Sequence, residues 1–204
     1  VLGAGDLELD YYGFIVSSLN KPLLFVFGNH NLSRLSAYKK NLQTSFDISP
    51  GESYLQPSFG STYIGSKVKL ISGVIVAGLG GSKKYNDGLN QFTELGMFFK
   101  ILKIAPKLIW NRIVHHRYLD ILLTHTPPFG IGDHPDPCHR GFRIFRWFLR
   151  RFRPLYMIHG HIHLFDLNAQ RESVYFDTRI INAYDHCIIE IEENDRSEEH
   201  TSEL

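Results

Sequence analysis

Short apolar runs alternate with longer amphipathic segments along the chain, which is the pattern of a layered α/β or mixed domain. The short runs have the length of buried strands, and we expect strands at residues 1–4, 23–27, 67–72, 74–78, 121–124, 155–159, 179–183 and 187–191. We expect helices at residues 11–19, 32–41, 90–117 with an interruption at Pro106, and 142–152. Three loops rich in Gly, Pro or Ser lie between them, at residues 47–65, 80–88 and 127–141. Long loops in a compact domain commonly build a site.

The composition is that of one ordinary globular domain, because 43% of the 204 residues are hydrophobic and 21% are charged. A net charge of +1 gives no electrostatic reason to expect a nucleic-acid or membrane partner. No apolar run approaches the roughly 18–20 residues that span a bilayer. Two cysteines, Cys138 and Cys187, are too few for a disulfide framework and fit a reducing compartment, so we expect a cytoplasmic protein.

The two ends of the chain differ from the rest. Val1 stands inside an expected strand, which predicts that an N-terminal segment is missing. Residues 196–204 have no apolar pattern and resemble the translation of a sequencing adapter, so we exclude them from the fold. The expected unit is a single domain over residues 1–195 that lacks its first strand, followed by a non-native tail over residues 196–204.

Histidine is unusually frequent, with 11 residues, and several histidines directly follow strand-like runs. Ligand groups in open α/β sheets gather at the carboxyl ends of the strands. Carboxylate, amide and imidazole groups together suit Mn, Fe or Zn better than Ca or Mg. The polar residues that follow four of the expected strands are Asp6, Asn29, His30, His125, His161 and His163.

Each of these residues alone has a simpler explanation. An Asp after a strand is commonly a turn or helix-capping residue, and a buried His commonly makes a structural hydrogen bond. Asn29 could supply a left-handed turn conformation. The repetition of such clusters at the same end of four strands is what favours a metal site.

Four short motifs occur in a familiar order along the chain. They are G-D at residues 5–6, G-N-H-N at 28–31, T-H-T-P-P at 124–128 and G-H-I-H at 160–163. In this order they resemble the motifs of the calcineurin-like metallophosphoesterases, and the resemblance covers nearly all of residues 1–191. It implies a layered β-sandwich flanked by helices, with a binuclear metal site that hydrolyses phosphate esters.

The resemblance also implies a role for each matched residue. Asp6 would bridge two metal ions, and Asn29, His125 and His161 would complete the ligands of the second ion. His163 would bind the first ion. The implied cofactors are two divalent ions, for which the donor types predict Mn, Fe or Zn.

His30 would lie beside the substrate phosphate, where it would stabilise the transition state or protonate the leaving oxygen. Asn31 follows it where the family usually has Asp or Glu, and a neutral amide stabilises an imidazolium less well. The family's opening D-x-H motif is absent from the chain, and we expect it upstream of Val1. Without the metal ligands of that motif, the chain as given is expected to be an impaired enzyme.

Two further segments carry groups that could contact a ligand. The loop at 132–141 holds His139 and Arg140, which could contact the substrate phosphate, although a proline-stiffened surface loop is an equal explanation. Residues 140–153 hold six arginines interleaved with apolar residues at helical spacing. The apolar stripe is expected to pack on the sheet and the arginines to be solvated, rather than bound to a membrane or nucleic acid.

The expected function is therefore metal-dependent hydrolysis of a small phosphate ester, monoester or diester, by a hydroxide held between two metal ions. Two alternatives stay open. One is a non-catalytic metal-binding or scaffold protein on the same fold, and the other is a nucleic-acid-binding module that uses the arginine helix. We expect no membrane or nucleic-acid partner, and the oligomeric state is open.

Overall fold

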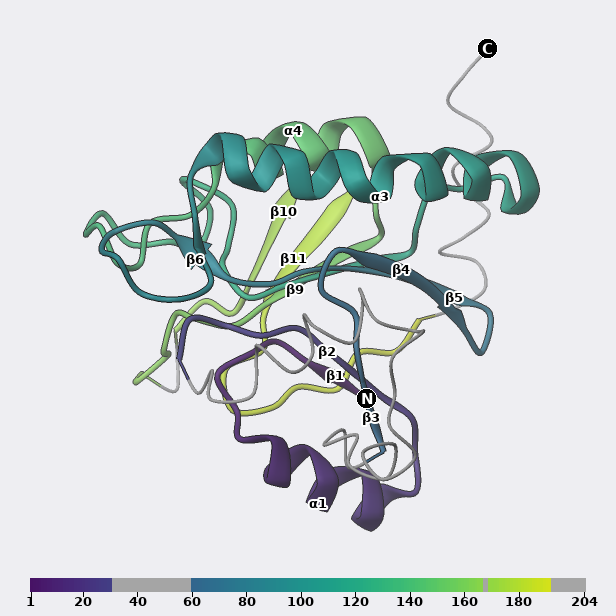
Figure 1. Ribbon diagram of the computed structural model, residues 1–204, viewed down its shortest axis with the longest axis horizontal. Helices are drawn as coiled ribbons and strands as arrows, with labels where there is room; N and C mark the ends of the chain where they lie inside the picture. Colours follow the sequence, from purple (N-terminus) through teal and green to yellow (C-terminus); the bar gives the residue numbers. More distant parts are fainter. Residues whose placement is uncertain (31–59, 167–168, 192–204) are drawn as a thin grey trace, which may run out of the picture.

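The computed structural model describes residues 1–30, 60–166 and 169–191 and shows a sandwich of four layers (Figure 1). A three-stranded sheet and a six-stranded sheet form the two inner layers. One helix covers the outer face of the smaller sheet, and two helices cover the outer face of the larger one. The expected α/β class, a layered β-sandwich flanked by helices, is confirmed. Within the described residues no helix is long and apolar enough to cross a membrane.

The smaller sheet is entirely parallel, in the order β1 (Leu2–Gly3), β2 (Leu23–Phe25), β3 (Ser61–Tyr63). Helix α1 (Leu9–Leu19) connects β1 to β2 and packs on the outer face of this sheet. Tyr12 of α1 lies against Phe25, with ring centres 4.8 Å apart. The strand–helix–strand connection places the ends of β1 and β2 side by side.

The larger sheet has parallel strands in its centre and an antiparallel pair at each edge. Its spatial order is β10 (Glu172–Tyr175), β11 (Thr178–Asn182), β9 (Tyr156–His159), β8 (Ile121–Thr124), β5 (Val74–Leu79), β4 (Lys67–Ile71). A two-stranded ribbon, β6 (Ser82–Lys83) with β7 (Gln91–Phe92), follows β5. Helices α3 (Glu94–His115) and α4 (Arg143–Phe152) lie over the outer face.

The central strands are apolar at nearly every position because both of their faces are covered. In β8, Leu122 points to the helices, whereas Ile121 and Leu123 point to the other sheet. In β9, Met157 lies on the helix side and Ile158 between the sheets. Such strands appear in the sequence as continuous apolar runs, which is why the sequence alone predicts them.

The two outer helices are joined at their N-termini by one carboxylate. Thr93 caps α3 by accepting a hydrogen bond from the Gly96 amide at 3.1 Å. Helix α4 has no side-chain cap of its own. Instead, the Glu94 carboxylate accepts hydrogen bonds from the amides of Arg143 and Ile144 at 3.0 and 3.1 Å, where the helix dipole favours negative charge. This contact fixes the start of α4 against α3.

Several sequence-based element predictions differ from the structure. The expected strand at 187–191 is not a strand; Cys187, Ile189 and Ile191 pack against the core between the sheets, whereas Ile188 is exposed. Pro106 does not interrupt α3, because the burial of Ile104 and Leu108 on either side outweighs one lost backbone hydrogen bond. Strands β3, β6, β7 and β10 were not predicted, since two to four residues give too little pattern. The expected helix at 32–41 lies outside the described residues.

Leu123→Ala tests the core between the sheets. Leu123 is fully buried there, so we expect the substitution to lower the free energy of unfolding by about 2–5 kcal/mol in urea denaturation. Leu70→Ala on β4 is the matched control, because Leu70 is 54% exposed and its loss should cost far less. Equal losses for the two variants would contradict this description of the core.

Candidate metal centre

Loops at the carboxyl ends of four strands meet at one edge of the sandwich. Asp6 follows β1, Asn29 follows β2, His125 follows β8 and His161 follows β9. Asp6 and His161 have left-handed backbone conformations, with φ of 61° and 67°. Non-glycine residues adopt this conformation uncommonly, and those that do so cluster at functional sites.

Three ligand atoms converge on one point at the centre of this edge. The Nε2 atom of His125 lies 3.2 Å from Asp6 Oδ2 and 3.1 Å from Asn29 Oδ1. The His161 ring is close by, with its centre 4.7 Å from that of His125. Donor atoms of Asp6, His125 and His161 all lie within 4.8 Å of one another. Two oxygens facing one nitrogen are a set of donor atoms that a cation can bind.

Backbone carbonyls orient both imidazoles. His125 Nδ1 lies 2.8 Å from the Ala4 carbonyl oxygen, and His161 Nε2 lies 2.7 Å from that of Cys138. A carbonyl can only accept, so these two nitrogens carry hydrogen. The other nitrogen of each ring, Nε2 of His125 and Nδ1 of His161, is the one that can bind an ion. Metal-binding histidines typically have this arrangement.

Two glycines allow the strands to approach closely enough for these contacts. A Cβ atom on Gly28 would collide with the Asp6 carboxylate and would lie 2.6 Å from His125 Cε1. A Cβ atom on Gly5, which has φ of 98°, would lie 2.7 Å from His125 Nδ1. The backbone at these two positions therefore forms part of the wall of the site.

The electrostatics of the site hold Asp6 charged and His161 neutral. Burial by itself raises the pKa of Asp6, but hydrogen bonds from His125 and from the His30 amide, together with electrostatic attraction to these two residues, lower it to about 2. Burial, and then repulsion from His125, lowers the pKa of His161 to about 4. An ionised carboxylate and a neutral imidazole are the protonation states that bind a metal ion.

The structure places the other residues of the predicted site at different distances from this centre. The backbone amide of His30 donates a hydrogen bond to Asp6 Oδ1 at 2.8 Å, and the His30 side chain is exposed. His163 is exposed, and its ring packs on Tyr184 at 5.0 Å between centres. Among the His, Cys, Asp and Glu side chains of the described residues, those of Asp6, His125 and His161 form the cluster of donor atoms at this edge, and His163 stands outside it. Asn31 lies outside the described residues.

The two residues predicted to contact substrate, both in the loop at 132–141, also differ in how near they lie to the centre. The ring centre of His139 lies 5.4 Å from that of His161, and its Nδ1 is 2.9 Å from Asp136 Oδ1. Arg140 is exposed and donates a hydrogen bond to the Pro135 carbonyl at 2.6 Å. His139 is therefore a neighbour of the centre, whereas Arg140 is engaged within its own loop.

Three residues that support the centre escaped the sequence analysis. The Asn29 amide donates to the Tyr85 hydroxyl at 3.2 Å, which leaves the Asn29 oxygen directed at His125. Asn90 donates to the Gly28 carbonyl at 2.6 Å and fixes that loop. Asn182 donates to the Ile162 carbonyl at 2.9 Å and fixes the loop that carries His161. Of these three residues, only Asn182 could have been found from the sequence. It stands near the end of an expected strand, and the predicted ligand residues likewise follow the ends of strands.

The donor set fits a first-row divalent ion. One carboxylate oxygen, one amide oxygen and imidazole nitrogens form a mixed set that suits Mn, Fe or Zn, whereas Ca and Mg require mainly oxygen. The close backbone approach at Gly28 leaves no room for a larger side chain beside Asp6. The types of donor atom and the close packing around Asp6 are therefore both compatible with a small divalent ion.

The chain belongs to the calcineurin-like phosphoesterase family, whose family model matches residues 1–165. This match covers β1, β2, β8 and β9 and the four loops that form the centre. The family resemblance expected from the four motifs is confirmed. None of the curated proteins compared with the chain matches it.

Solved structures agree on the fold. The crystal structure of TT1561 of Thermus thermophilus is similar with a TM-score of 0.55 and 14% sequence identity, over 88% of this chain and 72% of that one. Another crystal structure is similar with a TM-score of 0.54 and 16% identity, over 86% of this chain. The chain spans 62% of the length of that second protein. At these identities the similarity establishes the fold.

Gly28→Ala tests the close approach at the centre. The added methyl group displaces the Asp6 carboxylate, so we expect Mn²⁺ affinity to fall by about 10–100-fold in isothermal titration calorimetry, as for groups that position metal ligands. Gly96→Ala is the control, because a Cβ atom there meets its nearest neighbour at an ordinary 3.4 Å. Unchanged Mn²⁺ affinity in a folded Gly28→Ala protein would place the ion elsewhere.

His159→Asn tests the effect of pH on stability. Burial lowers the pKa of His159 to about 4, from its ordinary value of 6.5. Between these pH values the unfolded chain binds a proton there and the folded chain does not, so acid lowers the free energy of unfolding. We expect His159→Asn to reduce this slope by up to about 1.4 kcal/mol per pH unit in urea denaturation. The exposed His186→Asn variant should keep the slope of the parent, and an unchanged slope in His159→Asn would contradict the assignment.

Proposed function

We propose that this chain provides a metal-dependent phosphoesterase that hydrolyses small phosphate esters, either monoesters or diesters. The supporting observation is the convergence of Asp6 Oδ2, Asn29 Oδ1 and His125 Nε2, with His161 beside them, in a member of the calcineurin-like phosphoesterase family. Metal-dependent chemistry on phosphate esters follows from the family in general terms. The particular residues and their roles are part of the proposal.

In this proposal two divalent ions, Mn, Fe or Zn, are held between the carboxyl ends of the strands. Asp6 would contribute to holding both ions, Asn29, His125 and His161 would hold the second ion, and His163 would hold the first. Such ions, when bound, lower the pKa of water and neutralise charge on phosphoryl oxygens. Within the sequence given, the first ion would have fewer donors than the second, because no D-x-H motif occurs in these residues.

The remaining side chains of the site act on the substrate. The His30 amide is held by Asp6, which keeps the exposed His30 ring at the rim of the centre. From there the ring would donate a proton to the leaving oxygen, or donate a hydrogen bond to the phosphoryl group in the transition state. His139, next to His161, would contact the substrate, and Arg140 would do so after exchanging its bond to the Pro135 carbonyl for one to phosphate.

A non-catalytic metal-binding protein on the same fold is the second candidate. Two sequence features favour it: Asn31 stands where the family usually has an acidic residue, and the D-x-H motif is absent from the 204 residues. This candidate predicts that the chain binds a metal ion through the same residues and has no hydrolytic activity. The nucleic-acid module has no comparable support, and the cytoplasmic location stays a prediction.

Hydrolysis of bis-p-nitrophenyl phosphate tests the proposal, with the mono-ester analogue assayed in parallel. We expect low turnover that requires Mn²⁺ and is lost on chelation, because the first ion has few donors here. His161→Ala should lower the metal-dependent rate by at least about 100-fold. This loss is larger than the effect of removing a group that only orients a metal ligand. The exposed His186→Ala variant is the matched control.

The possible results separate the two candidates. Mn²⁺ binding without hydrolysis of either ester, in a folded protein, would support the non-catalytic protein. Full metal-dependent activity in a folded His161→Ala variant would show that the centre has been misassigned.

A further inference from the structure

Helix α3 is apolar on two opposite faces. One face is buried against the larger sheet and includes Met97, Ile101, Ile104 and Leu108. The opposite face repeats at a similar helical spacing and points away from the core; its large apolar members include Leu95, Phe99, Leu102, Ile109, Trp110 and Ile113. Amphipathic helices of globular proteins normally have one apolar face.

The exposed face of α3 is a considerable apolar surface. Phe99, Trp110 and Ile113 are 59%, 57% and 66% exposed. Single exposed apolar residues are ordinary, but a contiguous apolar surface with a polar rim is typical of an interaction site. Trp147 of α4 continues this surface, with its ring centre 6.3 Å from that of Phe98.

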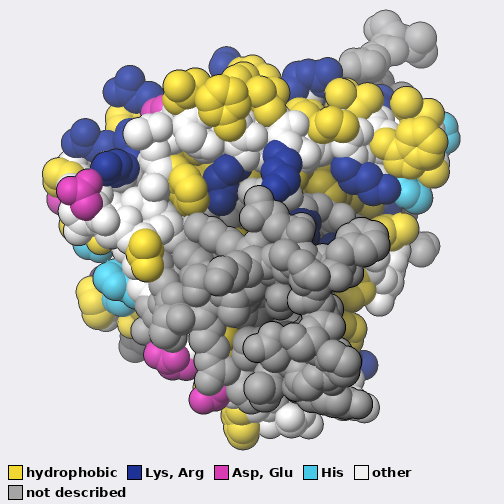
Figure 2. Space-filling view, in the orientation of Figure 1, with side chains coloured by type: hydrophobic (Ala, Val, Ile, Leu, Met, Phe, Trp, Pro, Cys, Tyr) yellow, Lys and Arg dark blue, Asp and Glu magenta, His cyan; other side chains and the backbone are white. Residues whose placement is uncertain are grey.

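The rim of this surface is strongly basic. Helices α3 and α4 together carry eight Lys and Arg residues and one acidic residue, Glu94. Glu94 already pairs with Lys83 at 3.1 Å and holds the first amides of α4. Figure 2 shows basic and hydrophobic side chains interleaved where Figure 1 places α3. The charge of this face is therefore far more positive than the net charge of the chain suggests.

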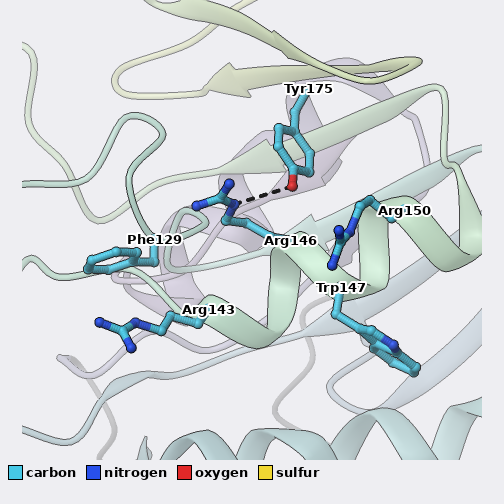
Figure 3. A pocket seen from close by; sticks show the side chains of 6 residues that line it. All are labelled: Phe129, Arg143, Arg146, Trp147, Arg150 and Tyr175. Atoms are coloured by element: carbon cyan, nitrogen blue, oxygen red, sulfur yellow. Dashed lines mark hydrogen bonds between the residues drawn. The ribbon is translucent and has the colours of Figure 1, made fainter.

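A cavity of about 350 Å³ lies at the α4 side of this face (Figure 3). It is lined by Phe129, Arg143, Arg146, Trp147, Arg150 and Tyr175. The Arg143 guanidinium lies over the Phe129 ring at 4.7 Å, and the Arg146 Nε donates to the Tyr175 hydroxyl at 3.3 Å. Aromatic groups thus hold two of the guanidiniums in place while their charge stays available.

The three arginines of the cavity repel one another. They lie at intervals of three and four residues on one helix, where like charges destabilise. Across residues 1–30, 60–166 and 169–191, no carboxylate forms an ion pair with any of these three guanidiniums. An anionic ligand would relieve this repulsion, and guanidinium groups bind phosphate in bidentate fashion.

We propose that the outer face of α3 and α4 docks on the surface of an anionic phospholipid bilayer. The apolar side chains of α3 enter the boundary between headgroups and acyl chains, and Lys and Arg stems extend toward the lipid phosphates. The cavity of Arg143, Arg146 and Arg150 receives a headgroup phosphate. Trp110 and Trp147 are suited to the interface, where tryptophan is enriched.

A bilayer explains the two halves of the surface better than other occupants. A second copy packed on the same face would place like charges opposite one another. Nucleic acid would satisfy the arginines and leave the apolar side chains of α3 in water. An anionic bilayer supplies phosphates and an apolar phase at the same surface.

Intrinsic fluorescence gives a direct test, because both tryptophans of the chain, Trp110 and Trp147, lie on this face. We expect the emission to shift to the blue on addition of vesicles made from equal parts of phosphatidylcholine and phosphatidylglycerol. Vesicles of phosphatidylcholine alone should bind far more weakly, and added salt should weaken the binding to anionic vesicles. The measurement requires neither substrate nor metal, so its outcome is independent of the proposed hydrolysis.

Variants separate the two parts of the surface. Changing Arg143, Arg146 and Arg150 to Gln should lower the affinity for anionic vesicles by about 100-fold, as expected for three basic groups near a charged bilayer. Phe99→Ser with Ile113→Ser should abolish the blue shift. Thermal unfolding of each variant checks that the exposed substitutions leave the fold intact.

The control variants carry equal changes elsewhere. Phe14→Ser alters a residue of α1, on the opposite outer layer, that is 63% exposed. Lys21→Gln with Lys69→Gln and Lys84→Gln removes the same charge outside α3 and α4. Both control proteins should bind anionic vesicles as the parent does.

Several results would overturn the proposal. One is the lack of binding to anionic vesicles, and another is equal binding by the arginine-to-glutamine protein. A blue shift produced by inorganic phosphate alone at matched ionic strength would indicate a soluble anion site. A concentration-dependent blue shift without vesicles would indicate that a second copy covers the face.

Discussion

The His125 imidazole joins the two sheets of the sandwich. It follows a strand of the larger sheet, and its Nδ1 is bonded to the Ala4 carbonyl at the end of β1 in the smaller sheet. Its Nε2 faces Asp6 and Asn29, which follow strands of that smaller sheet. Because His125 is 1% exposed, these contacts are made away from water, where an unpaired polar atom is costly. The same contacts of His125 therefore fix both the alignment of the two sheets and the geometry of the candidate centre.

That constraint explains the unusual backbone around the centre. Gly5 and Gly28 leave the space in which the His125 ring and the Asp6 carboxylate meet. Asp6 and His161 adopt left-handed conformations, so their side chains point to the same place from different loops. Each of these features costs some stability alone, and a divalent cation is the kind of ligand that recovers it by binding the converging donors.

The outer helical layer carries a proposed binding surface that is separate from the metal centre. The metal-binding edge proposed above lies at the ends of strands, whereas the face proposed to contact lipid covers the far side of the larger sheet. The sequence predicts solvated arginines and no membrane partner, because the net charge is small and α4 has a clear apolar stripe that faces the core. Both observations are correct, but neither describes how α3 and α4 combine their exposed residues on one surface.

The sequence by itself determined the strands covered on both faces, the long helices and the four motif loops, because these depend on local apolar pattern and on residue type. Asp6, Asn29, His125 and His161 follow parallel strands, so their approach could be expected from topology. Only the tertiary structure decided where His163 and Arg140 lie and which short strands form. It also decided that Tyr85 and Asn90 support the loop that carries Asn29. Such features depend on contacts between residues distant in sequence, and no local pattern encodes which side chains meet across the gap between two sheets or on the outside of two helices.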